Sequence, residues 1–146
     1  MRHIALASAL AILTPLASAQ VPAVLGTCIV THLSPDDRQD IARWVYLSMS
    51  VHPGVRRLST ESTKATEEAA AQKMGALFTR TLRDMCPREL REAAGAGGPP
   101  IVSSAINFFT QLGVQELMTN KEVLAVHSSF SQYADREGID RIVRTK

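Results

Sequence analysis

The chain has 146 residues, enough for one domain, and its 16 Lys and Arg against 14 Asp and Glu leave a formal charge of only +2. A balance so close to neutral produces no strong positive field, so nucleic acid and anionic lipid are not favoured as partners. No segment alternates between apolar and polar residues as a half-buried strand does. The expected secondary structure is therefore helical.

Residues 1–19 have the layout of a secretory signal peptide. Arg2 precedes an apolar run from Ile4 to Leu16, and Ala17-Ser18-Ala19 supplies the small residues at which a signal peptidase cuts. The run is too short to cross a membrane. We therefore expect this segment to be removed, which leaves a single helical domain at 20–146 with no transmembrane segment, located in the periplasm or secreted.

The two cysteines, Cys28 and Cys86, are an even pair in a chain that is expected to reach an oxidising compartment. We predict one disulfide, which would tie the segment before the central helix to the end of the helix after it. Closing a loop of this length stabilises the folded state by roughly 4 kcal/mol in the chain-entropy model. An alternative stays open, because Leu25-Gly26-Thr27-Cys28 resembles a lipoprotein box, in which Cys28 would be lipidated instead.

The central helix is expected at Leu33 to His52. Ser34 is a good N-cap, and Pro35 suits the first helical position because its missing N–H would be unpaired there anyway. The helix should stop at His52, since the residue before Pro53 is pushed out of the α region. Its apolar residues are Ile41, Trp44, Val45, Leu47, Met49 and Val51. Because they cover more than half of the circumference, the second half of this helix should be surrounded by protein.

Further helices are predicted by the spacing of apolar residues. They span Thr63–Met85, Ile101–Met118 and Asn120–Glu137, with a shorter helix at Arg88–Ala94 and a glycine-rich hinge at Gly95–Pro100. Short loops between such helices favour antiparallel neighbours. The predicted fold is all-α: a small antiparallel bundle of four main helices plus short helical turns, stapled by the disulfide.

Three positions within these helices lead to local predictions. Thr119 and Glu122 have the spacing of a capping box, which would start the last helix at a tight corner. Gly113 marks either a close approach of another helix or a bend. His127 lies on the apolar side of the last helix and is expected to be partly buried.

No motif specifies a reaction or a cofactor. His32, His52 and His127 match no metal-ligand spacing, so neither a metal nor another cofactor is predicted. No serine lies in GxSxG or SxxK, and the segment Gly95–Pro100 lacks the Lys-Ser/Thr ending of a phosphate loop. No catalytic residue is predicted, although a metal site built from His32 and His52 stays an alternative.

Two surfaces and one pocket are the candidate binding sites. The helix at Ile101–Met118 has a strip of uncharged polar side chains, whereas a solvent-facing helix side usually contains Lys and Glu. The strip is Ser103, Asn107, Gln111 and Gln115, and the basic pair Arg56 and Arg57 is a separate candidate surface. The aromatic residues that could line a pocket for an apolar ligand are Trp44, Phe108 and Phe109. Filling the core is the simpler role for these aromatic side chains.

The pattern of helix-core residues resembles uncharacterised small exported helical proteins of Gram-negative bacteria. The residues that carry the resemblance are Trp44-Val45, Ser48-Met49, His52-Pro53, Phe109, Leu112-Gly113, Phe130 and Tyr133. The resemblance implies a periplasmic location and a helical fold, and it supplies no catalytic residues.

Together these observations favour a non-catalytic periplasmic protein that binds another protein, as an inhibitor, an immunity-type protein or an envelope adaptor. A carrier of a small apolar ligand held between helices is one alternative, and an enzyme with a dispersed site is another. The sequence specifies neither the partner nor the oligomeric state.

Overall fold

The computed structural model describes residues 21–60, 62–95 and 100–144. Within these residues there are seven α-helices and no strand, which confirms the all-α prediction. No helix in the described ranges combines the length and hydropathy needed to cross a bilayer. The predicted signal peptide at 1–19 lies outside the described residues, as do positions 96–99 of the predicted hinge.

The N-terminal part of the fold is a pair of helices joined at a tight corner, α1 (Ala23–His32) and α2 (Pro35–Ser50). The Ser34 hydroxyl accepts a hydrogen bond from the Asp37 N–H at 3.1 Å, and the Asp37 carboxylate accepts one from the Ser34 N–H at 3.0 Å. This reciprocal pair is a capping box. Helix α2 confirms the predicted central helix, whereas α1 lies where no element is predicted, because Gly26 weakens the helical pattern there.

The middle of the chain forms a long helical segment that packs against α2 and then turns back toward α1. Helix α3 (Lys64–Thr79) continues into a π-helical segment, η2 (Arg80–Met85), and Cys86 separates this from α4 (Pro87–Gly95). In η2 the Cys86 N–H donates to the carbonyl of Thr81, five residues back, at 2.9 Å. These elements confirm the helices predicted at 63–85 and 88–94.

Helix α5 (Ile101–Thr119) packs on α2, and α3 packs on another side of α2, so α2 is central as expected. Phe109 of α5 is fully buried, and its ring centroid lies 5.4 Å from that of Phe78. A Cβ at Gly113 would lie 2.5 Å from Val45 Cγ2, so this glycine marks a close approach of two helices. The buried core around Phe109 consists of Leu25, Ile29, Leu33, Ile41, Met74, Leu77, Leu82, Cys86, Ala93 and Ala105.

One expectation for α2 is wrong: its second half is not surrounded. Tyr46, Met49 and Val51 are 46%, 52% and 45% exposed. The elements that pack most closely on α2 are α5 and α3, and they leave one side of its C-terminal half open.

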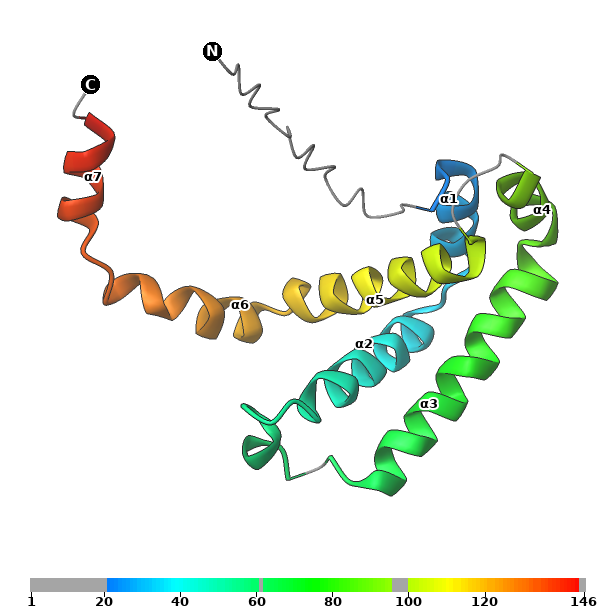
Figure 1. The fold of residues 1–146 in the computed structure, drawn as a ribbon, viewed down its shortest axis with the longest axis horizontal. Coiled ribbons are helices and arrows are strands. Elements are labelled where there is room, and N and C mark those ends of the chain that lie inside the picture. The colour runs from blue at the N-terminus through cyan, green and yellow to red at the C-terminus, as the bar shows by residue number, and fades with distance from the viewer. Residues whose placement is uncertain (1–20, 61, 96–99, 145–146) are drawn as a thin grey trace, which may run out of the picture.

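The chain ends in three short elements that we call the arm, residues 121–144: α6 (Lys121–Ser128), η3 (Ser129–Gln132) and α7 (Arg136–Arg144). We call residues 21–119 the body. The arm projects away from the body in Figure 1, and none of its three elements contains a buried residue. The single helix expected at 120–137 is therefore divided, and His127 is exposed rather than partly buried.

A bundle of four antiparallel helices is not confirmed. In Figure 1, α3 runs opposite to α2, but α5 runs in the same general direction as α2, and α6 continues outward from α5.

The predicted capping box at Thr119 is also wrong. The Asn120 side chain caps α6 instead, since its Oδ1 accepts from the N–H groups of Glu122 and Val123 at 2.9 and 3.1 Å. Thr119 donates its hydroxyl to the Glu116 carbonyl at 2.7 Å.

Candidate functional site

The uncharged strip predicted as a partner surface lies on the exposed side of α5. Its four residues, Ser103, Asn107, Gln111 and Gln115, are all exposed. Three large apolar side chains of the same helix are exposed as well: Val102 at 54%, Ile106 at 45% and Val114 at 38%. This side of α5 therefore mixes apolar and uncharged polar groups.

The second predicted surface lies after the end of α2. Arg56 and Arg57 form the short 3-10 helix η1 (Arg56–Leu58), and both are exposed. Leu58 beside them is 81% exposed. This pair lies on η1 and the strip lies on α5, so the two are separate surfaces.

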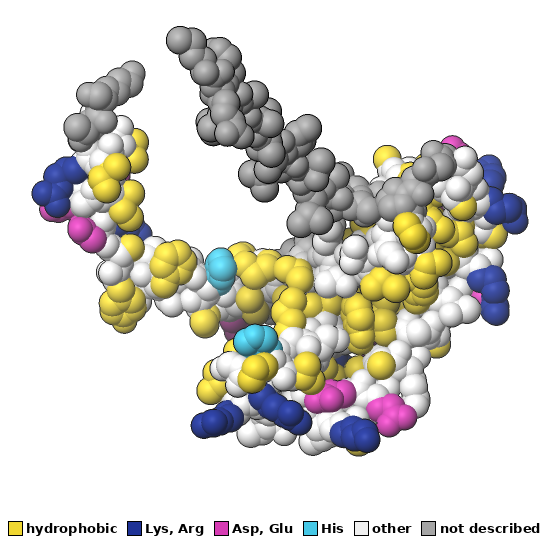
Figure 2. All heavy atoms as spheres, viewed as in Figure 1, with side chains coloured by type: hydrophobic (Ala, Val, Ile, Leu, Met, Phe, Trp, Pro, Cys, Tyr) yellow, Lys and Arg dark blue, Asp and Glu magenta, His cyan; other side chains and the backbone are white. Residues whose placement is uncertain are grey.

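The arm continues the apolar side of α5 away from the body. Figure 2 shows hydrophobic side chains over α5 and onward along the arm. Eight large apolar side chains of the arm are exposed by 37–84%: Val123, Leu124, Val126, Phe130, Tyr133, Ile139, Ile142 and Val143. The sequence pattern did not identify them as a surface, because apolar residues at helical spacing predict a buried face.

The residues predicted to line an apolar pocket pack against the core. Phe109 is fully buried, and Trp44 and Phe108 are half-buried against the same cluster. A different pocket, of about 510 Å³, opens between α2 and α3. It is lined by Asp40, Arg43, Tyr46, Leu47, Thr66, Ala69, Ala70 and Lys73. Asp40 and Lys73 form an ion pair there at 2.8 Å, and none of the three predicted aromatic residues lines this pocket.

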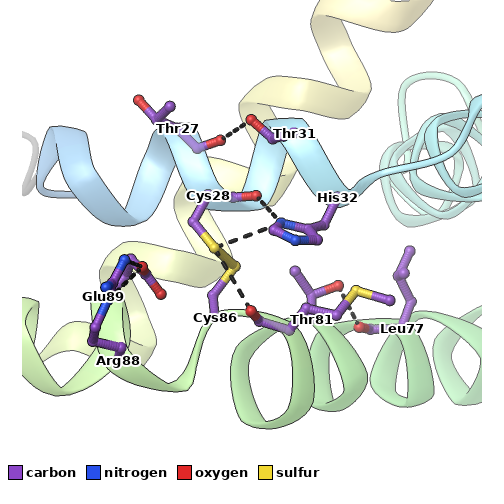
Figure 3. Close-up of a disulfide and its surroundings, with 10 residues drawn as sticks. Thr27, Cys28, Thr31, His32, Leu77, Thr81, Cys86, Arg88 and Glu89 are labelled. Atoms are coloured by element: carbon purple, nitrogen blue, oxygen red, sulfur yellow. Dashed lines mark hydrogen bonds and ion pairs between the residues drawn. A yellow bond between two sulfur atoms is a disulfide. The ribbon is translucent and has the colours of Figure 1, made fainter.

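The predicted disulfide is present and has a histidine beside it (Figure 3). Cys28 of α1 is bonded to Cys86, with Cα atoms 6.0 Å apart, so lipidation of Cys28 is not the state that the structure shows. The Nδ1 atom of His32 lies 3.6 Å from Cys28 Sγ and 2.9 Å from the Cys28 carbonyl oxygen. Ligand atoms of all three residues lie within 4.8 Å of one another.

Local structure explains why these three side chains meet. Cys28 and His32 are four residues apart on α1, so they lie on the same side of the helix. On the other side of the bond, Cys86 directly follows the π-helical segment η2, and such segments are frequent at functional sites. Cys86 is fully buried, whereas Cys28 is half-buried and His32 is exposed.

A shallow pocket of about 460 Å³ lies against this cluster on the side of α1. Cys28, His32 and Glu89 are among its lining residues. The Arg88 guanidinium donates to the Glu89 carboxylate at 2.7 Å and holds the pKa of that carboxyl below its usual range. The Glu89 carboxylate in this pocket is therefore paired with a positive charge.

The cluster around Cys28 was missed in the sequence although a signal for it is present. Cys28 and His32 have the i, i+4 spacing that places two ligands on one side of a helix. Because no helix is predicted at 23–32, that spacing has no structural meaning in the sequence alone. The contact with Cys86 depends on how η2 and α1 pack.

No protein-family model, curated protein or solved structure matches this chain. The resemblance to small exported helical proteins therefore stays a prediction.

Proposed function

We propose that the protein is an exported, non-catalytic module that binds another protein through the arm and the adjoining exposed side of α5. We call this surface the arm–α5 face. It consists of the eight exposed apolar residues of the arm together with Val102, Ile106 and Val114. The exposure of these side chains along the arm is the single observation that carries the proposal.

The short elements of the arm support a binding role, because none of them contains a buried residue that would hold it against the body. Helix α7 has nine residues, and isolated helices shorter than about 12–15 residues are marginal in water. Ile139, Ile142 and Val143 lie on it at three- and four-residue steps, and they are 55%, 77% and 75% exposed. Exposed apolar patches are typical of interaction sites.

The charge of the arm favours a protein partner over an anionic membrane. Between Lys121 and Arg144 there are four basic and four acidic residues. An arm without excess positive charge gains little attraction from anionic lipid headgroups. Beside the apolar residues lies the uncharged strip of Ser103, Asn107, Gln111 and Gln115. This composition resembles the centre of a protein interface, where charged residues are depleted.

The class of partner and the location follow from the rest of the molecule. A disulfide is the expected state of a cysteine pair in the periplasm or outside the cell, and it supports the predicted export. A body that is constrained by a disulfide loses less conformational entropy on binding than an unconstrained one. These features suit an inhibitor, an immunity-type protein or an envelope adaptor, in which the body holds the arm and the arm supplies the contacts.

Site-specific photo-crosslinking tests the proposal in the native compartment. We would place p-benzoylphenylalanine at Tyr133 on the arm, at Leu58 beside Arg56 and Arg57, and at Gln72 on the exposed side of α3. We expect one protein to be crosslinked from position 133, and crosslinking from position 72 to be absent.

The control positions give each result a meaning. Crosslinking from position 58 alone would indicate that the partner binds at Arg56 and Arg57 instead of the arm. Equal crosslinking from all three positions, or none from position 133, would contradict the proposal. An adduct of twice the protein's own mass would identify the partner as a second copy.

A second candidate function is a carrier of a small apolar ligand, and the pocket between α2 and α3 supports it. Its volume of about 510 Å³ lies in the usual range for ligand sites, roughly 300–1,000 Å³. Ala70→Trp would fill this pocket, whereas Ala71→Trp adds the same side chain on the exposed side of α3. If the protein is a carrier, a fluorescent fatty-acid probe binds the wild type and Ala71→Trp but not Ala70→Trp. Equal binding by all three would exclude the pocket.

A further inference from the structure

We propose that Cys28, His32 and Cys86 form a zinc site when their disulfide is reduced. The site would be separate from the arm–α5 face, because it lies where α1 meets the end of η2. Cys28 and His32 belong to α1, and Cys86 lies 58 positions after Cys28 in the sequence.

The ligand set is the first argument. Two thiolates and one imidazole are soft and borderline ligands, which Zn²⁺ binds at about 2.3 Å for sulfur and about 2.0–2.1 Å for nitrogen. Hard ions such as Mg²⁺ and Ca²⁺ prefer oxygen ligands instead. Ligand atoms of the three residues already lie within 4.8 Å of one another in the oxidised protein. Reduction frees the two sulfur atoms from each other, so that one ion could take both of them together with the His32 ring.

The position of His32 is the second argument. A carbonyl oxygen can only accept, so the Nδ1–H group donates to the Cys28 carbonyl at 2.9 Å. Nδ1 is also the ring nitrogen that lies 3.6 Å from Cys28 Sγ. To bind an ion there, the ring would move its proton to Nε2 and give up the hydrogen bond to the Cys28 carbonyl. Figure 3 shows the imidazole turned toward the two sulfur atoms.

Access for the ion is the third argument. Cys86 is fully buried, but Cys28 and His32 line the pocket of about 460 Å³ on the side of α1. Glu89 also lines this pocket, where its carboxylate is paired with the Arg88 guanidinium at 2.7 Å. Three protein ligands would leave a fourth coordination position for water or another small ligand.

The change of state is a two-electron reduction followed by metal binding. A dithiol reductant attacks one sulfur as a thiolate, forms a mixed disulfide, and closes its own disulfide as it releases the second cysteine. The reductant loses two electrons and two protons, and Cys28 and Cys86 gain them as thiols. When Zn²⁺ binds, both thiols release their protons to solvent, so the ion is held by two thiolates and the His32 imidazole.

Zinc affinity of the full chain in the two redox states tests the site. The protein would be reduced with a trialkylphosphine, which takes its oxygen from water to become the phosphine oxide, and titrated with Zn²⁺ against a chromophoric chelator. We expect one Zn²⁺ per chain in the reduced wild type and none in the oxidised protein. Co²⁺ substituted for Zn²⁺ should show a sulfur-to-metal charge-transfer band.

Two histidine variants decide whether the site is the one described. His32→Ala should weaken Zn²⁺ binding by about tenfold or more, since it removes one of three ligands. His127→Ala, an exposed histidine on the arm, should leave the affinity unchanged. Circular dichroism of the same samples records whether the reduced chain is helical before and after the ion is added.

The outcomes separate a built site from simple thiol binding. Equal affinity in the wild type and His32→Ala would overturn the proposal, whether the reduced chain is folded or unfolded, because unfolded cysteines would then account for the binding. Zinc binding by the oxidised protein would also overturn it. If reduction unfolds the chain, the proposal requires that Zn²⁺ restore helicity in the wild type and His127→Ala but not in His32→Ala.

Discussion

The body and the arm are built from similar amphipathic sequence and end in opposite environments. In the body, Phe109 is fully buried and touches Phe78, whereas Phe130 of the arm is 66% exposed. The body is also closed by the Cys28–Cys86 bond, and the arm has no comparable constraint in its described residues. The contrast indicates that stability is concentrated in the body, so the apolar residues of the arm are available for another molecule.

The strongest test of this contrast is to remove one phenylalanine from each region. Phe109→Ala should lower the free energy of unfolding by about 3–5 kcal/mol, because it deletes a buried ring and leaves a cavity. Phe130→Ala should change it by less than about 0.5 kcal/mol, since an exposed side chain loses few contacts. Urea unfolding followed by circular dichroism measures both values. A large loss in Phe130→Ala would show that the arm packs on the body in solution.

Removing the disulfide should also affect the body alone. The double variant Cys28→Ser with Cys86→Ser opens a loop whose ends are 58 positions apart, which costs about 4 kcal/mol in the chain-entropy model. Hydrogen exchange resolved by segment should show faster exchange in α1 and α4, while the arm exchanges quickly in both proteins. Slower exchange in the wild-type arm than in the body would reverse the comparison.

The same contrast explains which features the sequence predicts. The start of α2 follows from Ser34 and Pro35, because capping chemistry is local and needs no knowledge of neighbours. The disulfide follows from an even pair of cysteines, and the structure confirms it. Whether an apolar helix side is covered depends on tertiary packing, and for this reason the exposure of Met49 and Phe130 is not predictable from periodicity.

The candidate sites show the same division between local and non-local information. The exposed strip on α5 is correctly placed on the surface, since uncharged polar residues at helical spacing are a local signal. The cluster of Cys28, His32 and Cys86 needs α1 and the π-helical segment before Cys86, and neither is predicted. A sequence pattern predicts the side of a helix, but packing decides which sides meet.

Substitution of two glycines tests how closely the helices of the body pack. Gly113→Ala should destabilise the protein by about 1–3 kcal/mol, because the added Cβ would lie 2.5 Å from Val45 Cγ2 and 3.0 Å from the Ile41 carbonyl. Gly75→Ala on α3 has nothing within 4 Å of the new Cβ and should stabilise the protein by about 0.5–1 kcal/mol. Thermal unfolding of the two variants gives opposite shifts if α2 and α5 are in close contact. A stabilising Gly113→Ala would show that the two helices are further apart.

The smallest effect is expected from a carboxylate that joins two helices of the body. Burial works to raise the pKa of Asp37, but hydrogen bonds from the Ser34 hydroxyl and N–H and from the Arg80 guanidinium, at 2.7 Å, outweigh it and lower the pKa below 3.8. A lowered pKa in the folded state means that the unfolded chain takes up the proton first as the pH falls. The contribution of Asp37 is therefore present above the ordinary aspartate pKa and is lost as the pH falls below it.

Substitution of Asp37 should reproduce this loss at neutral pH. Asp37→Asn should destabilise the wild-type fold by about 1 kcal/mol at pH 7, where the carboxylate caps α2, and by less at pH 3. Asp140→Asn is the matched variant in the arm, where the ion pair with Arg144 at 3.8 Å is exposed and contributes little. We expect no measurable change for Asp140→Asn at either pH in urea unfolding. Equal destabilisation by the two variants would mean that charge pairs stabilise the arm as much as the body, and the assignment of stability to the body would fail.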